Sequence, residues 1–200
     1  MAVTEDQKEK RRQIILTAPL FPLLVKMAIP TIIGMVVVMI YNLTDTFFIA
    51  MLDNKSMTAA IGINFSYMSI IQAVGFWFGY GSGNAMSKSL GAGNGEEAET
   101  ISSTAVLLAV VIGFITAAIS IIFINPLTLF IGGSASESLY KFTKEYLTVM
   151  AVSIPAVLFS LTVYNQLRLC GNVKDGMKGL TSGMIINIVL DPVFIFGFAP

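Results

Sequence analysis

The sequence predicts an all-α fold, a polytopic bundle of about five transmembrane helices. Of its 200 residues, 55% are hydrophobic and only 12% are charged, whereas about 25% of the residues in soluble domains are charged. The polar side chains are therefore too few to cover a globule of this size in water. Long stretches without charge alternate with short polar segments, a pattern typical of helices that cross a bilayer.

Five stretches are long enough to span the hydrocarbon layer, since a helix of about 20 apolar residues crosses roughly 30 Å. Residues 1–26 are predicted to form a basic cytoplasmic segment, and residues 27–200 to hold the helices. The approximate limits of the predicted helices are 28–51, 57–86, 100–124, 145–167 and 179–199.

Local signals mark several of the helix ends. Asn125-Pro126 and the glycine pair Gly132-Gly133 end the third helix, and a short interfacial helix can follow it. Ser134-Ala-Ser-Glu137 then predicts the start of the fourth helix, with a serine N-cap and an acid close by. Glu96 and Glu97 follow a glycine-rich turn and suit the positive end of the third helix.

The distribution of Lys and Arg favours a cytoplasmic N-terminus in a plasma (inner) membrane, because cytoplasmic loops are enriched in positive charge. With that orientation, few positive charges lie outside. The inner segments hold Lys8, Lys10, Arg11, Arg12, Lys26, Lys88, Arg168, Lys174 and Lys178, and the outer loops hold Lys55, Lys141 and Lys144.

The composition argues against several kinds of site. The formal net charge is zero, whereas a nucleic-acid binder needs a basic face. The chain has no His and a single Cys, which excludes His-ligated zinc, an internal disulfide and a zinc–thiolate cluster. We expect no organic cofactor and no catalytic residue.

Two carboxylates lie inside otherwise apolar spans, at Asp45 and Asp191. An ionised Asp at the bilayer centre costs roughly 2.5–3.5 kcal/mol on insertion scales, so such residues usually face a bundle interior or a watery cavity. Each has a hydrogen-bonding residue four positions earlier, Tyr41 and Asn187, on the same helical face. At 1.5 Å per residue, both acids fall in the outer half of the membrane and could share one cavity.

This set of residues predicts a cation- or proton-responsive site. Pro192 cannot donate to the carbonyl of Ile188, so a free carbonyl lies beside an amide and a carboxylate. Asp45, Asp191 and Asn187 could together hold Na⁺, since hard cations prefer oxygen ligands. A coupling ion, H⁺ or Na⁺, that neutralises the carboxylate would compete there with a cationic substrate.

Other polar and aromatic residues are weaker candidates. Candidates for the substrate cavity are Asn42, Thr44, Asn165 and Trp77, and candidates for hinges are Pro155 and Pro192. Structural roles stay open for the residues of the predicted ion site. Asp45 could be a juxtamembrane acid, Asp191 could cap a helix break, and Tyr41 and Asn187 could form interhelical hydrogen bonds. Asn165 also suits the membrane interface, and Trp77 suits packing or contact with lipid.

Four stretches resemble the multidrug and toxic compound extrusion (MATE) transporters. They are PLLVKMAIPTIIGMVVVMIYNLTDTFFIAML, SKSLGAGNGEEAE, RLCGNVKDGMKG and NIVLDPVFIFG, and their order and spacing are more specific than any one of them. The Asn187-x-x-x-Asp191-Pro192 motif is similar to the DinF-like branch of that family.

The resemblance implies a fold and a function. MATE transporters are about twice this length, with twelve helices in two six-helix lobes, and they export cationic and amphipathic compounds by antiport with H⁺ or Na⁺. The chain would supply helices 1 to 5 of the N-terminal lobe, with the remaining C-terminal lobe and the lipid bilayer as partners. In the DinF-like branch, residues that match Asp45, Asp191 and Asn187 form the ion-responsive site, and Tyr41 matches a neighbouring tyrosine.

Two other functions are alternatives. A flippase for lipid-linked substrates in the same superfamily would favour basic residues in its cavity, whereas the intramembrane charges here are acidic. An intramembrane aspartyl protease could use Asp45 and Asp191 to activate water. However, such enzymes carry a Gly-x-Gly-Asp motif, and Leu190-Asp191-Pro192 does not match it.

Overall fold

The structure is a computed structural model that describes residues 17, 19–51 and 54–197, and in these residues it is helical and contains no strand. The predicted all-α bundle is confirmed. The helices are α2 (Leu20–Ala50), α3 (Lys55–Gly91), α4 (Gly95–Ile122), α5 (Ile124–Phe130), the 3₁₀ turn η1 (Gly133–Ala135), α6 (Glu137–Leu169) and α7 (Val173–Phe196).

The five long helices in the described residues are long enough to cross a membrane. Within the described residues, α3, α4 and α6 are long and apolar enough to do so. Helices α2 and α7 have 31 and 24 residues. At 1.5 Å per residue they extend about 46 and about 36 Å, longer than the hydrocarbon layer.

All five long helices begin before their predicted transmembrane spans, because apolar composition marks only the part in hydrocarbon. Helix α3 covers Lys55–Gly91 where 57–86 was expected, and α6 covers Glu137–Leu169 where 145–167 was expected. The predicted basic residues Lys8, Lys10, Arg11 and Arg12 lie outside the described residues.

The helix ends follow local chemistry. Ser136 is the N-cap of α6, and its Oγ accepts a hydrogen bond from the Leu139 amide at 3.2 Å, which satisfies one of the free N–H groups of the first turn. This matches the start signal in the sequence. Glu96 and Glu97 lie in the first turn of α4 as predicted. Gly93 (φ 85°) and Gly171 (φ 80°) form the turns before α4 and α7, with a backbone that glycine adopts at little cost.

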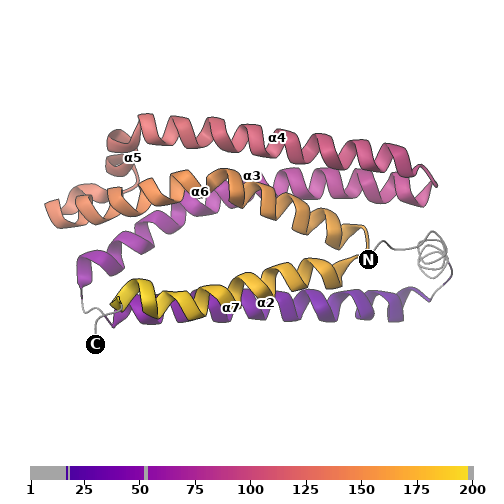
Figure 1. The fold of residues 1–200 in the computed structure, drawn as a ribbon, viewed down its shortest axis with the longest axis horizontal. Coiled ribbons are helices and arrows are strands. Elements are labelled where there is room, and N and C mark those ends of the chain that lie inside the picture. The colour runs from indigo at the N-terminus through magenta and orange to yellow at the C-terminus, as the bar shows by residue number, and fades with distance from the viewer. Residues whose placement is uncertain (1–16, 18, 52–53, 198–200) are drawn as a thin grey trace.

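Helices α3, α4 and α6 form a tightly packed three-helix bundle (Figure 1). Glycines along one face of α3 let α6 approach closely: a Cβ on Gly79 would lie 2.7 Å from the Asn165 Cβ. On α4, a Cβ on Gly113 would lie 2.7 Å from the Pro155 Cα. Small residues are the usual means of close helix contact in membranes. The core cluster is Tyr67, Ile71, Ala109, Ala117, Leu147, Ala151, Ile154 and Leu158.

Buried polar contacts add specificity to this bundle. The Gln166 Nε2 donates to the Ser82 Oγ at 3.0 Å, and the Ser102 Oγ donates to the Gln166 Oε1 at 3.0 Å. One amide therefore joins all three helices. Farther along, the Asn64 Nδ2 donates to the Thr143 carbonyl at 3.3 Å. Interhelical hydrogen bonds of this kind contribute about 0.6 kcal/mol each on average.

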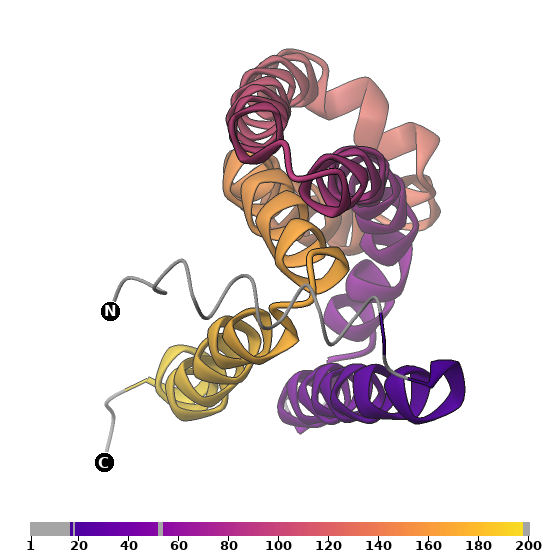
Figure 2. The same ribbon diagram turned by 90° about the vertical axis from the view of Figure 1, so that its right-hand side faces the viewer.

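Helices α2 and α7 form a separate pair. They pack against each other and run in the same direction, and the pair lies on one side of the three-helix bundle (Figures 1 and 2). The pair meets the bundle mainly where α7 contacts α6, and α2 touches α3 only lightly. The molecule therefore has a compact bundle and a more loosely attached helix pair.

Candidate functional site

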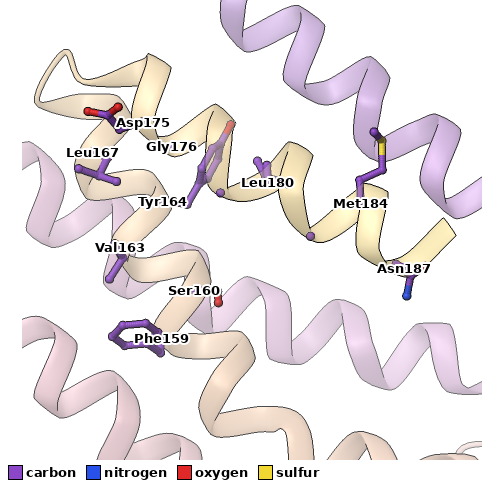
Figure 3. Close-up of a pocket in the computed structure, with 12 residues that line it drawn as sticks. Phe159, Ser160, Val163, Tyr164, Leu167, Asp175, Gly176, Leu180, Met184 and Asn187 are labelled. Carbon is purple, nitrogen blue, oxygen red and sulfur yellow. The ribbon is translucent and has the colours of Figure 1, made fainter. Parts of the chain in front are cut away.

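A cleft of about 500 Å³ lies between α6 and α7, at the border of the bundle and the helix pair (Figure 3). Asp175 and Asn187 mark its two ends. Its walls are predominantly apolar, which suits a small amphipathic molecule. The lining residues are Phe159, Ser160, Val163, Tyr164, Leu167, Asp175, Gly176, Gly179, Leu180, Gly183, Met184 and Asn187.

The space in the cleft comes from the glycines of α7. A Cβ on Gly179 or Gly183 would meet no atom within 4 Å. At Gly176, in contrast, a Cβ would lie 3.2 Å from the Tyr164 Cδ2. The cleft is therefore open along the middle of α7 and filled by an aromatic ring at the end near the α6–α7 turn.

The two predicted acids occupy equivalent positions on neighbouring helices. Asp45 precedes the last residue of α2, Ala50, by five positions, and Asp191 precedes the last residue of α7, Phe196, by five positions. Because the two helices are parallel neighbours and their C-terminal ends lie side by side (Figure 1), their backbones place positions 45 and 191 at about the same level. The side chains of Tyr41, Asn42, Asp45, Asp191 and Pro192 lie outside the described residues.

Asn187 lies between the cleft and the level of positions 45 and 191. It lines the cleft, and its side chain is half-buried. Asp191 follows one helical turn later, so the two residues lie on one face of α7. A site at positions 45 and 191 would therefore be next to the end of the cleft.

Three of the predicted cavity residues, Thr44, Asn165 and Trp77, do not line this cleft. The Thr44 hydroxyl donates to the Ile40 carbonyl of its own helix at 2.9 Å. Asn165 is fully buried against α3, and its Nδ2 donates to the Leu161 carbonyl at 2.8 Å. Trp77 is 75% exposed on α3 and borders a separate groove beside α4. Whether each of these side chains is buried or exposed depends on how the helices pack. The polarity of a residue alone does not predict that.

The predicted hinge at Pro155 lies inside α6, which continues to Leu169. The backbone of Pro155 is the surface against which Gly113 of α4 packs. A proline removes one helical hydrogen bond, and here that position is in tight contact with a neighbouring helix.

Tyr164 was not predicted as a site residue, and Arg168 was considered only for its charge. The Arg168 guanidinium lies 5.2 Å from the Tyr80 ring centroid and 5.9 Å from the Tyr164 ring centroid, within the range of a cation–π interaction. The i,i+4 spacing of Tyr164 and Arg168 was the available signal. The contact of Arg168 with Tyr80 of α3 depends on how the chain folds, so the sequence alone could not predict it.

Metal-ligand clusters are absent from the side chains that the structure describes: no three of their His, Cys, Asp and Glu residues lie close enough to hold an ion. The predicted Na⁺ ligands Asp45 and Asp191 are not among those side chains. Na⁺ binding by these two residues and Asn187 therefore stays a prediction.

Comparison with protein families identifies the chain. The family model described as MatE matches residues 30–193, which overlaps each of the five predicted helices. The chain belongs to the MATE family. Members of this family are membrane transporters, in agreement with the apolar helices of this MATE protein.

Curated relatives of the MATE chain include proteins that are named for different cargoes. It is 30% identical over 191 residues to a FAD transporter of Shewanella oneidensis, covering 96% of this chain and 42% of that protein. It is also 30% identical over 178 residues to the multidrug export protein MepA of Staphylococcus haemolyticus, covering 89% of this chain and 39% of that protein. The chain thus spans about 40% of the length of these relatives.

Solved structures agree on the fold. A MOP superfamily transporter from Pyrococcus furiosus is 28% identical with a TM-score of 0.81, over 88% of this chain and 38% of that one. An outward-facing multidrug resistance MATE family transporter is 28% identical with a TM-score of 0.79, over 88% of this chain and 39% of that one. This extent fits the prediction of an N-terminal portion of a MATE transporter.

Proposed function

We propose that this MATE chain forms part of a secondary transporter that exports cationic or amphipathic compounds in exchange for H⁺ or Na⁺. The observation that carries the proposal is the position of Asp45 and Asp191 at one level of two parallel, neighbouring helices. Two acids in an apolar layer need a polar cavity or an ion to compensate their charge. The family and the multidrug export relatives support this function.

The proposed mechanism is competition for negative charge. While an acid is ionised, it attracts a cationic compound in the cleft. Binding of H⁺ or Na⁺ at Asp45, Asp191 and Asn187 neutralises that charge, which weakens the hold on the compound and changes how α2 and α7 pack. An ion can shift the helix arrangement only by its difference in affinity for the two arrangements, and a buried carboxylate supplies such a difference.

The coupling ion is tested by measuring efflux of a fluorescent cation from proteoliposomes of the intact protein, with Na⁺ and pH gradients imposed separately. We expect one inward gradient to drive efflux and the other to leave it at the level seen without a gradient. Efflux that is indifferent to both gradients would contradict antiport.

A second cargo class is supported by one specific comparison. The FAD transporter of Shewanella oneidensis aligns with 96% of this chain. A nucleotide cofactor is anionic, so it would be repelled by ionised acids and attracted by Arg168. Competition by FAD in the same efflux assay separates the two classes, since only a shared pathway lets FAD slow the release of the fluorescent cation.

We also propose that the N-terminus is cytoplasmic in the inner membrane, so that the α6–α7 turn faces the cytoplasm. Cys170 lies in this turn and is the only cysteine. A membrane-impermeant maleimide should therefore label Cys170 in inside-out vesicles but not in intact cells. Labelling from outside in intact cells would reverse the orientation.

The pH dependence of this labelling follows from the burial of the thiol. Burial raises the pKa of the Cys170 thiol above its usual value. A raised pKa leaves less thiolate at neutral pH, and the thiolate is the reactive form. The labelling rate of Cys170 should therefore keep rising at pH values where an exposed cysteine peptide has reached its plateau.

A further inference from the structure

Tyr164 is a residue of α6 that reaches both helices of the α2–α7 pair. Its ring lies against the first turns of α7 beside Gly176 (Figure 3), where a Cβ would come within 3.2 Å of the Cδ2 and 3.4 Å of the Cε2. Its hydroxyl lies 3.6 Å from the position of a Cβ on Gly34 of α2. Each approach is made at a glycine, so no side chain at these two positions separates Tyr164 from either helix.

Arg168 holds this ring from the side of the bundle. It follows Tyr164 by one helical turn and lies over both the Tyr164 ring and the Tyr80 ring of α3. It forms no ion pair with a carboxylate among the described side chains. The two rings therefore orient the guanidinium, and through it α3 supports Tyr164.

The position of the ring relates this cluster to the cleft. Tyr164 lines the cleft together with Leu167 and Gly176, at the end next to the α6–α7 turn. Beyond it, Gly179 and Gly183 leave the cleft open toward Asn187. A molecule that moves along the cleft from the turn therefore meets the Tyr164 ring before it reaches that open part.

We propose that Tyr164 is a wedge that closes the cleft at its turn-side end, and that Arg168 and Tyr80 hold the wedge in place. The wedge stays closed while Gly176 packs on the ring and Gly34 packs on the hydroxyl. It opens when the α2–α7 pair moves away from α6. The ion-responsive positions 45 and 191 lie toward the opposite end of this same pair, so its movement would couple them to the wedge. The inference rests on the proposed transport function, in which this end faces the cytoplasm.

Access to the cleft tests the wedge without any need for transport. In the intact protein, Cys170→Ser removes the chain's native thiol, and Met184→Cys places a reporter beyond the ring. We expect a membrane-impermeant maleimide to label this reporter in inside-out vesicles several-fold faster after Tyr164→Ala. Tyr164→Phe, which keeps the ring, should label at the rate of the parent.

Arg168→Gln is the second variant, because it leaves both rings intact and perturbs only their support. It should increase labelling to an intermediate extent, and Arg168→Lys should restore part of the protection. Tyr140→Ala is the matched control on α6. The Tyr140 hydroxyl donates to the Asn125 Oδ1 at 3.0 Å, and this contact lies away from the cleft. It should leave labelling unchanged.

Transport provides a separate measurement. The wedge predicts that Tyr164→Ala raises downhill leak of a fluorescent cation relative to ion-driven efflux, which a loss of folded protein would not do. Labelling at the parent rate in both Tyr164→Ala and Arg168→Gln would overturn the wedge, whatever the efflux. If the parent protein carries no cation but Tyr164→Ala still exposes the reporter, the proposed cargo is wrong and the wedge stands.

Discussion

Asp191→Asn is expected to reduce ion-driven efflux in the intact protein on the order of 100-fold, and Asp45→Asn is expected to do the same. Placing an ionised Asp at the bilayer centre costs about 2.5–3.5 kcal/mol. At 1.4 kcal/mol per factor of ten, this corresponds to a change on the order of 100-fold in an equilibrium. An amide carries no charge for the coupling ion to neutralise. The free-energy difference between the ionised and the neutralised side chain is therefore lost. The measurement is efflux of a fluorescent cation under the gradient that drives the parent.

The double variant distinguishes one shared site from two independent ones. If the acids act together, removing both should cost no more than removing either one, because groups that act as a unit are not additive. Glu99→Gln is the matched control, since Glu99 is exposed near the start of α4. It should efflux like the parent. Normal efflux in both single variants would reject the proposed coupling site.

Gly113→Ala is expected to give the largest loss of stability among single methyl additions to the bundle. The new Cβ would lie 2.7 Å from the Pro155 Cα and 3.3 Å from the Pro155 nitrogen. Backbone cannot turn aside as a side chain can, so α4 and α6 must separate. Overpacking of this kind costs about 1–3 kcal/mol. Thermal unfolding of the purified protein in detergent should show a lower midpoint.

Gly62→Ala provides the control with the opposite sign. Gly62 is exposed on α3, and a Cβ there would meet nothing within 4 Å. Replacing glycine by alanine inside a helix favours the helix by about 0.8–1.0 kcal/mol when no clash results. The midpoint should therefore stay the same or rise. Equal losses at Gly62 and Gly113 would mean that close packing on Pro155 does not limit stability.

The helices and their ends could be predicted from the sequence because they depend on local chemistry. The serine cap at Ser136, the acids Glu96 and Glu97, and the turn glycines act within a few residues of their own positions. Helix lengths were underestimated, since polar residues such as Lys55 and Glu137 extend a helix beyond the apolar layer. The acids Asp45 and Asp191 stand out because charge is rare in an apolar span.

The arrangement of the helices could not be predicted in the same way, because it depends on residues far apart in the chain. Asn165 reads as a polar residue near a helix end, and only the approach of α3 at Gly79 shows that it is buried. Tyr80 and Arg168 are separated by almost half the chain, so their contact has no local pattern. The cleft depends on which faces of α6 and α7 meet, and hydropathy does not specify that.

The pairing of α2 with α7 has a consequence for biogenesis. Helix α2 ends at Ala50 and its main partner begins at Val173. At 5–20 residues per second of synthesis, about 120 intervening residues take roughly 6 to 25 s. Throughout that interval the first long helix of the described chain must wait in lipid or beside the insertion machinery. The helices α3, α4 and α6 are therefore all synthesised before α2 can dock on α7. A substitution that weakens this docking would lengthen the exposure of α2 to quality-control proteases.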